Sequence, residues 1–303
     1  MSKIKETYKS SDTEEFLDKI FYRPIGYVIA LGAKSLHMTP NQVTIASIFA
    51  GVAGGHMFYY SDLELNIYGI LLMMLAQALD GADGQLARMT NSQSRVGRIL
   101  DGVSDNLKFI SVYVHIIIRL LENDYTPWII PIAVVSGFSH ALQSAMADYS
   151  RNFYIYYALD KEKSEIDESS PLKEKYKNLS WKKEPGYKFL IRVYLNYTIQ
   201  QEFIAYKMKE LYAFTKENFG DNIPNWFRAE YKRLHKPLLK WYNILTSNTR
   251  LIALFIGLLI GFPEMFWAFE LTVLNFLLLY VVLKHNKNSE YLQKLTIKKL
   301  DNR

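Results

Sequence analysis

The sequence predicts an all-α, polytopic membrane protein with six transmembrane helices, an N-terminal interfacial helix and a cytoplasmic helical insertion. Apolar runs close to the roughly 20 residues that span a bilayer occur six times in the 303-residue chain. Polar and strongly charged segments separate these runs, as loops and cytoplasmic parts of a membrane protein would. Cysteine is absent, so the chain contains no disulfide framework and no thiol chemistry.

The chain before the first predicted span favours a helix lying along the membrane. Residues 15–36 mix Tyr22 and Arg23 with apolar side chains, a composition typical of an interfacial helix. Thr39 or Asn41 then caps the first membrane helix, and Pro40 stands at an early position where proline is tolerated.

The six predicted spans form two groups, four in the first half of the chain and two near its C-terminal end. The last two form a hairpin that Gly261-Phe262-Pro263 interrupts. The fifth apolar run is short, so we expect its start to extend back toward Asn243. The predicted spans are residues 43–60, 67–88, 97–121, 128–149, 251–261 and 266–283.

Charge in the connections predicts the orientation. Three short loops contain acidic residues but no Lys or Arg, namely 61–66, 121–126 and 261–265. The positive-inside rule therefore places both termini, the 89–96 loop and the long insertion in the cytoplasm. We expect an integral protein of the cytoplasmic (inner) membrane, with the functional residues near its cytoplasmic face.

The insertion is basic and aromatic. Residues 151–250 contain 19 Lys or Arg against 12 Asp or Glu. One interpretation is a surface that holds anionic lipid headgroups, and the other is ordinary solvated helices. No groove-reading or base-stacking module is present, so we expect no nucleic-acid partner. The predicted divisions are 1–38, 39–151 (catalytic spans 1–4), 152–245 (insertion), 246–285 (spans 5–6) and 286–303 (tail).

Four aspartates lie where the sequence predicts membrane helices. Asp80 and Asp83 are three residues apart, and Asp101 and Asp105 are four apart, so each pair shares one helix face. An ionised carboxylate at bilayer depth costs about 2.5–3.5 kcal/mol or more unless it is paired. Four carboxylates converging from two helices would form the oxygen-rich site that Mg²⁺ or Mn²⁺ prefers. The spacing predicts a site for one or two metal ions.

These residues form a longer string with fixed spacing, and its two parts are separated by eight residues. The string resembles the signature of the CDP-alcohol phosphotransferase (CDP-alcohol phosphatidyltransferase) family of integral membrane enzymes, and every signature position is matched. The matching residues are Asp80-x-x-Asp83-Gly84-x-x-Ala87-Arg88 and Gly97-x-x-x-Asp101-x-x-x-Asp105.

The resemblance implies a reaction and a role for each residue. Asp80, Asp83, Asp101 and Asp105 would be the metal ligands, and Asp105 would also take the proton from an attacking hydroxyl. A CDP-linked donor, expected to be CDP-diacylglycerol, would release CMP in making a phospholipid. The segment Thr39-Pro40-Asn41-Gln42-Val43-Thr44 is similar to a part of the family's nucleotide pocket. The implied donor-binding residues are Asn41, Gly84, Ala87, Arg88 and Gly97, with Thr44 as a weaker candidate.

The resemblance implies a polar alcohol as the acceptor, and inositol phosphate is our first expectation. The segment 18–25 looks like the corresponding part of inositol-phosphate-using members. The phosphate of such an acceptor would need cationic partners, for which the candidates are Lys108, Arg151 and Arg250. The chain departs from many bacterial members at Asn106, where they carry Lys or Arg.

Other interpretations stay open at this point. A phosphotransferase using CDP-ethanolamine or CDP-choline would reverse the role of the lipid. A cation transporter would also use carboxylates, although its acidic residues should extend across the bilayer. A non-catalytic lipid-binding scaffold would not need Arg88 and both glycines. Arg88 could instead anchor a helix end among lipid headgroups. Lys108 could simply pair with Asp105, and Arg151 could serve only membrane topology. The resemblance further implies a homodimer.

Overall fold

The computed structural model describes residues 12–159 and 164–301, and the regular elements in these ranges are all helical. Contacts divide the chain into two compact units, and three of the divisions fall inside helices. The first unit comprises Met1–Gly137, Trp181–Tyr194 and Arg250–Phe269. The second comprises Phe138–Ser180, Leu195–Thr249 and Glu270–Arg303.

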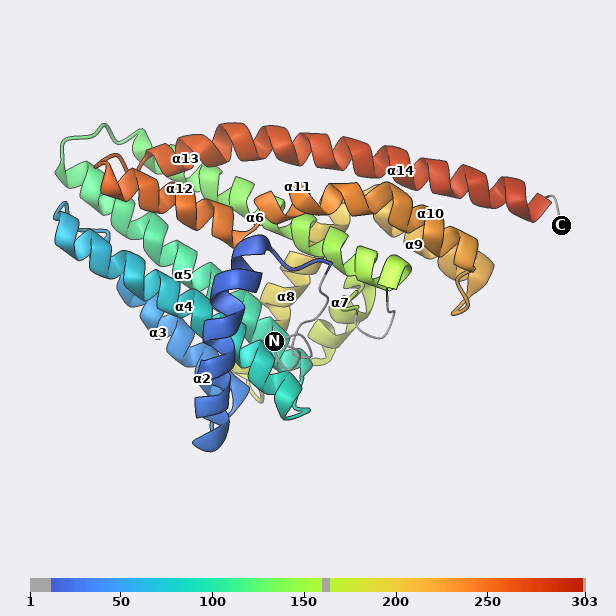
Figure 1. The fold of residues 1–303 in the computed structure, drawn as a ribbon, viewed down its shortest axis with the longest axis horizontal. Coiled ribbons are helices and arrows are strands. Elements are labelled where there is room, and N and C mark those ends of the chain that lie inside the picture. The colour runs from blue at the N-terminus through green and yellow to red at the C-terminus, as the bar shows by residue number, and fades with distance from the viewer. Residues whose placement is uncertain (1–11, 160–163, 302–303) are drawn as a thin grey trace. The chain divides into compact units, whose positions relative to one another are not determined.

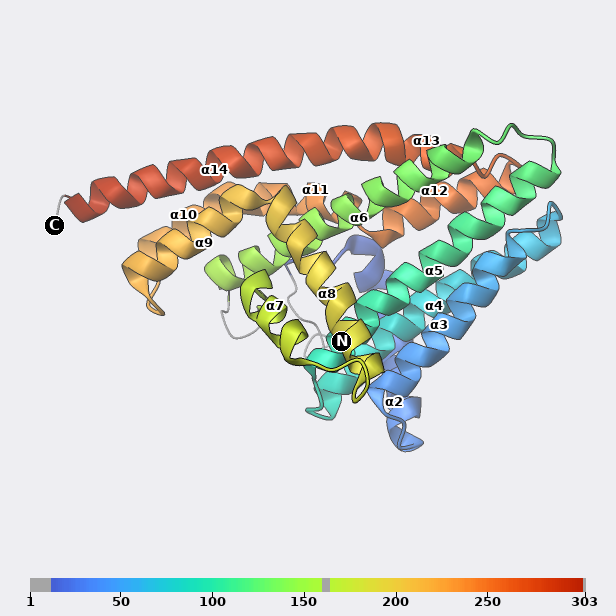
Figure 2. The ribbon, with the colours of Figure 1, turned by 180° about the vertical axis from the view of Figure 1, so that it is seen from behind.

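The first unit is built around three long helices. A π-helical turn, η1 (Asp18–Tyr22), continues directly into α2 (Arg23–Ser35), which packs against α4 (Leu63–Met89). The helix α3 (Pro40–Met57) packs against both α4 and α5 (Arg95–Glu122), as Figures 1 and 2 show. The remaining parts are the starts of α6 (Ile129–Tyr154) and α8 (Pro185–Ile204), with α12 (Ser247–Leu259) and α13 (Met265–Phe269).

Side-chain caps fix where the three central helices begin. Thr39 caps α3, as expected: the Gln42 N–H donates to the Thr39 hydroxyl at 3.3 Å, and the Thr39 N–H donates to the Gln42 amide oxygen at 2.8 Å. Asp62 caps α4 by accepting from the backbone of the third helical residue at 2.9 Å. Ser94 caps α5 by accepting from the Gly97 N–H at 3.0 Å. Each cap satisfies a backbone donor that helix geometry leaves unpaired.

Glycines let α3 approach its two neighbours closely. A Cβ atom at Gly54 would lie 2.9 Å from the carbonyl oxygen of Gly69 on α4 and 3.1 Å from the backbone nitrogen of Met73. A Cβ atom at Gly55 would lie 2.6 Å from the hydroxyl oxygen of Ser111 on α5. These contacts leave no room for side chains, so small residues determine how closely these helices pack.

Both the interior and the outside of the helices are rich in apolar side chains. The main core cluster of the first unit includes Phe58, Met73, Ile116 and Trp267, all of them buried. Large apolar side chains also face outward, for example Phe49, Leu71, Phe138, Phe276 and Leu283. Four helices in the described ranges are long and apolar enough to cross a membrane: Leu63–Met89, Ile129–Leu159, Asn225–Leu259 and Met265–Asp301. Outward apolar faces on such helices are features of a membrane protein.

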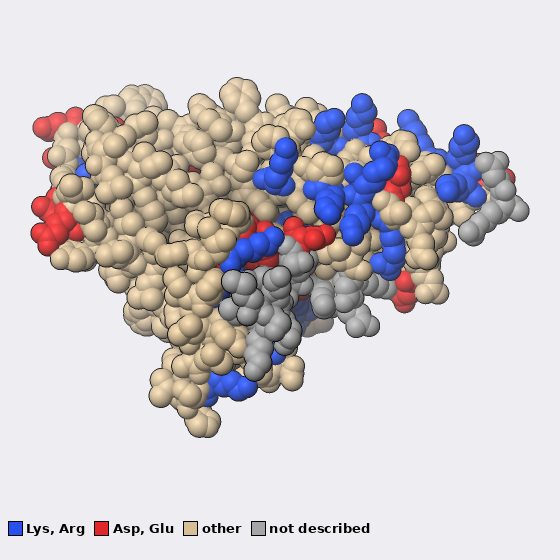
Figure 3. Space-filling view, viewed as in Figure 1, with Lys and Arg blue, Asp and Glu red and all other residues tan. Residues whose placement is uncertain are grey.

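The end of the first unit that carries the loops after α3, α5 and α12 is acidic, and it contains a buried polar contact. The Arg119 guanidinium of α5 donates to the Asn66 amide oxygen of α4 at 3.2 Å and to the Phe58 carbonyl at 3.4 Å. Acidic side chains gather at this end (Figure 3), where the loops after α3, α5 and α12 carry Asp62, Asp124 and Glu264 among others. Asp80 lies eighteen positions after Asp62 along α4, about 27 Å of helix at 1.5 Å per residue.

The second unit consists of shorter helices and one long one. It contains η2 (Ile155–Leu159), α7 (Ser169–Asn178), α9 (Tyr206–Phe219), α10 (Asn225–His235), η4 (Lys236–Leu238), α11 (Leu239–Ile244), η5 (Glu270–Leu274) and α14 (Asn275–Asp301). The helix α14 packs against α9 and α10, and its buried residues recur at helical spacing through Val281, His285, Ser289, Leu292 and Thr296. Lys and Arg side chains gather over α10, α11 and the C-terminal half of α14 (Figure 3).

A buried carboxylate ties α7 to α8 and α9 in the second unit. Glu202 accepts from the Ser169 N–H and hydroxyl, both at 2.7 Å, and pairs with the Lys209 ammonium at 2.6 Å. Burial alone would raise the pKa of Glu202, but these donors outweigh it and hold the pKa below its usual value. Its stabilising effect is therefore full above the unfolded-state pKa and is lost as the pH falls through the lower folded-state pKa.

Replacing Glu202 with Gln is expected to destabilise the protein by about 1–3 kcal/mol near neutral pH, because hydrogen bonds to a charged group are lost. The difference in stability from wild type should shrink as the pH falls through the lowered pKa of Glu202, because the wild-type carboxylate then becomes protonated. Thermal unfolding of the purified chain across this pH range measures both effects. Glu210→Gln is the control, since the Glu210 side chain is 51% exposed and pairs with Lys207 on the same helix turn. A loss of stability in Glu202→Gln that does not change with pH would contradict the stabilising role of the Glu202 carboxylate.

Candidate functional site

The first aspartate pair lies on the C-terminal half of α4, facing α3 and α5. Asp83 is buried and accepts a hydrogen bond from the Thr44 hydroxyl of α3. Asp80 pairs with the Lys108 ammonium of α5, its Oδ1 lying 2.8 Å from Nζ. The two carboxylates of α4 are therefore contacted by both neighbouring helices, as their shared helix face predicted.

The second pair lies in the N-terminal half of α5, two to three turns after its Ser94 cap. Asp105 Oδ1 lies 2.8 Å from Lys108 Nζ, so this ammonium bridges Asp80 on one helix and Asp105 on the other. Asp101 interacts electrostatically with all three other aspartates. The structure thus brings the four carboxylates of the sequence signature into one cluster.

The cluster has carboxylate oxygens, the donors that Mg²⁺ and Mn²⁺ bind. Within residues 12–159 and 164–301, however, no three acidic, histidine or cysteine side chains are already arranged around one point as metal ligands. The Lys108 ammonium lies between Asp80 and Asp105 instead. The donor set fits a divalent ion in its chemistry, provided that Lys108 makes room.

Two expected donor-binding positions lie together at the start of α5. A Cβ atom at Gly97 would lie 3.6 Å from the amide oxygen of Asn41 on α3 and 3.2 Å from the Ser94 hydroxyl. On α4, a Cβ atom at Gly84 would lie 3.3 Å from the guanidinium of Arg88, so that side chain folds back over the glycine. Ala87 lies on the same turn and is partly buried.

Arg23 and its partners form a contact beside the cluster that the sequence did not predict. The Arg23 guanidinium pairs with Glu14 at 2.9 Å and reaches the Gly81 carbonyl at 3.5 Å, and it also interacts electrostatically with Asp80. Burial alone would lower the pKa of Arg23, but the adjacent Glu14 carboxylate more than compensates and raises it. Gln85 donates to the Arg23 carbonyl at 3.2 Å. Arg23 is thus a permanent positive charge next to the aspartates.

One known protein family matches the segment of the chain that carries the aspartate cluster. Residues 37–154, which contain the whole cluster from Thr44 to Lys108, match the family model of CDP-alcohol phosphatidyltransferase. Residues 37–154 are a CDP-alcohol phosphatidyltransferase domain. Proteins of this family transfer phosphate-linked groups, so the domain is that of an enzyme.

Curated relatives resemble this phosphatidyltransferase domain and carry names with different acceptors. The CDP-diacylglycerol–serine O-phosphatidyltransferase of Helicobacter pylori is 35% identical over 74 residues, covering 24% of this chain and 30% of the relative. The archaetidylinositol phosphate synthase of Pyrococcus horikoshii is 35% identical over 78 residues, covering 26% and 40%. The CDP-diacylglycerol–glycerol-3-phosphate 3-phosphatidyltransferase of Rickettsia bellii is 30% identical over 106 residues, covering 34% and 58%. The chain therefore spans less than two thirds of each of these relatives.

The three basic candidates for acceptor binding lie in different places. Lys108 lies inside the phosphatidyltransferase cluster, where it pairs with two aspartates. Arg250 is fully buried on α12 of the first unit. Arg151 lies on the part of α6 that belongs to the second unit. Asn106, the departure from many bacterial members, donates to the Gly102 carbonyl of its own helix at 2.7 Å.

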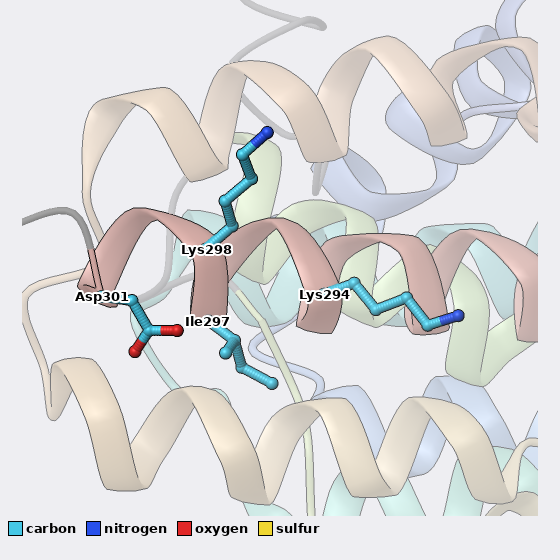
Figure 4. Close-up of a pocket in the computed structure, with 4 residues that line it drawn as sticks. All are labelled: Lys294, Ile297, Lys298 and Asp301. Atoms are coloured by element: carbon cyan, nitrogen blue, oxygen red, sulfur yellow. The ribbon is translucent and has the colours of Figure 1, made fainter.

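A shallow hollow on the second unit lies outside the phosphatidyltransferase domain. Four residues of α14 line it, and the side chains of Lys298 and Asp301 point apart (Figure 4). No group from another element is among its lining residues, Lys294, Ile297, Lys298 and Asp301. We assign it no role, because a ligand site needs polar groups that converge.

Proposed function

We propose that this chain transfers a phosphatidyl group from CDP-diacylglycerol to a polar alcohol with release of CMP, and that the alcohol is inositol phosphate. The observation that supports this most directly is the interaction of all four signature aspartates within the phosphatidyltransferase domain. Names of relatives that include archaetidylinositol phosphate, serine and glycerol 3-phosphate support an alcohol acceptor.

In this proposal each carboxylate has a defined task. Asp80, Asp83 and Asp101 hold Mg²⁺ or Mn²⁺, with Asp105 as a further ligand, and Thr44 orients Asp83. The bound ion would neutralise the diphosphate and make CMP a better leaving group. Asn41, Gly84, Ala87, Arg88 and Gly97 surround the cytidine diphosphate.

Asp105 accepts the proton of the attacking hydroxyl. The hydroxyl oxygen forms a bond to the phosphorus that carries diacylglycerol, while the bond from that phosphorus to CMP breaks. The Asp105 side chain is 47% exposed, compared with 16% for Asp80, so a soluble alcohol reaches it more easily. A general base must lie within hydrogen-bond reach of its proton, which favours this more accessible carboxylate.

The proposal includes a membrane arrangement. We infer six spans, with α3 and α5 crossing in addition to the four apolar helices, and an interfacial helix formed by η1 and α2. The lysine-free, acidic loops would face away from the cytoplasm, and the aspartates would lie near the cytoplasmic face of the inner membrane. Pairing of two copies through their spans completes this arrangement.

The acceptor is tested with purified protein, CDP-diacylglycerol, Mg²⁺ or Mn²⁺, and a panel of alcohols. We expect CMP release with inositol phosphate at least about tenfold faster than with serine or glycerol 3-phosphate, since a site built to bind a substrate's polar groups rejects analogues lacking them. CDP-choline or CDP-ethanolamine with diacylglycerol is the comparison that tests the reversed reaction. A strong preference for another alcohol would mean that this alcohol, and not inositol phosphate, is the acceptor. No CMP release with any pair of substrates would reject the proposal.

A further inference from the structure

Lys108 occupies a site that several residues of the domain build around it. Its ammonium lies 2.8 Å from a carboxylate oxygen of Asp80 and 2.8 Å from one of Asp105. It also lies 3.5 Å from the Ser47 hydroxyl of α3, and the whole side chain is only 3% exposed. The ammonium is therefore held at the centre of the aspartate cluster.

A glycine of α3 makes room for the lysine stem. A Cβ atom at Gly51 would collide with the Lys108 Cγ and would lie only 2.7 Å from Cδ and 3.2 Å from Cβ. Gly51 and Ser47 are one turn apart on the same face of α3. Gly51 leaves room for the methylene groups of Lys108, and Ser47 places a hydroxyl near its ammonium. This position is shaped for a lysine pointing at the aspartates.

The same ammonium stands where a cation bridging α4 and α5 would bind. Asp80 and Asp105 come from different helices, and Lys108 is the group that joins them. Two cations held a few ångströms apart in a poorly solvated site repel each other strongly. The carboxylates cannot keep both the lysine and a divalent ion in these contacts.

We propose that Lys108 is a built-in counter-ion that competes with the divalent cation of the aspartate cluster. Its ammonium pairs with Asp80 and Asp105 when no divalent ion is bound, and it withdraws when an ion binds. This inference rests on the proposed function, which supplies the divalent ion. Lys108 is thus a positioning residue that prevents the cluster from repelling itself in the ion-free protein.

The test is Mn²⁺ binding to the purified full chain, which is measured through the electron paramagnetic resonance signal of free Mn²⁺. Lys108→Met keeps the stem and removes the charge, and we expect it to bind Mn²⁺ roughly 5- to 150-fold more tightly, the range typical of coupled sites. Arg119→Met is the matched control. It removes a buried cation from the same helix, three turns further on, and Arg119 contacts Asn66 rather than an aspartate. Its Mn²⁺ affinity should equal that of wild type.

Thermal unfolding provides the second readout. In chelator, Lys108→Met should unfold at a lower temperature than wild type, and Mn²⁺ should raise its unfolding temperature by more. Gly51→Ala displaces the Lys108 side chain but keeps its charge, so this variant should also bind Mn²⁺ more tightly. It is the alternative test if Lys108→Met does not fold. Unchanged or weaker Mn²⁺ binding by these variants, with wild type still binding, would overturn the role of Lys108 alone. Absence of Mn²⁺ binding in wild type and variants would overturn the metal-dependent function and this inference together.

Discussion

Replacing Asp105 with Asn is expected to lower the rate of CMP release by about 100- to 10,000-fold, the usual contribution of a general base. Asn has nearly the same size but cannot accept the proton of the attacking hydroxyl. Asp105 is also the most suitable base by position, because its side chain is half exposed while Asp83 is buried and bound by Thr44. Binding of the CDP-linked donor should persist, since Asp80, Asp83 and Asp101 remain.

The experiment measures CMP release and donor binding on the same preparation. Asp124→Asn is a suitable control, because Asp124 lies in the loop after α5 with a φ of 61°, a conformation that Asn adopts readily. That variant should keep full activity. Loss of donor binding together with turnover in Asp105→Asn would contradict the role of Asp105 as the base.

Replacing Gly54 with Ala is expected to destabilise the protein by about 1–3 kcal/mol, the typical cost of forcing an extra methyl group into a packed interior. The new Cβ would meet backbone atoms of Gly69 and Met73 on α4 at 2.9–3.1 Å, and backbone cannot turn away as a side chain can. The two helices would have to separate, which would also move Asp80 and Asp83 relative to Thr44.

Thermal unfolding of the full chain tests this packing. Gly32→Ala on α2 is the matched control, because a Cβ at Gly32 would meet nothing within 4 Å. There we expect no loss and a gain of about 0.5–1 kcal/mol from the better helix propensity of alanine. Equal unfolding temperatures for the two variants would mean that α3 and α4 are not in close backbone contact.

The sequence predicted much of the helical framework because local rules determine it. The predicted spans at 43–60 and 97–121 correspond to α3 and α5, and the Thr39 cap is where the threonine and the following proline indicated. The shared face of each aspartate pair was also predictable, since the i, i+3 and i, i+4 spacings put both carboxylates of a pair on one side of the helix. These features depend on residues close together in the sequence.

Features that depend on the packing of distant residues were not predictable in the same way. The sequence placed Lys108 near Asp105, but its bridge to Asp80 depends on the room that Gly51 leaves on another helix. The segment 286–303 was predicted as a cytoplasmic tail, and in the structure α14 continues through it to Asp301, with Ser289 and Leu292 buried at helical spacing.

The buried contact of Arg119 has a consequence for the register of α4 and α5. Lys108 joins α5 to Asp80, and three turns further along the helix Arg119 joins it to Asn66. Sliding one helix along the other would break both contacts together and remove the α4 partners of Lys108 and Arg119 inside the protein. In the proposed function the divalent ion is itself held by carboxylates of both helices, so it would replace Lys108 as the link at this end while Arg119 keeps the link at the other. The axial alignment of α4 and α5 would therefore be the same with and without the ion.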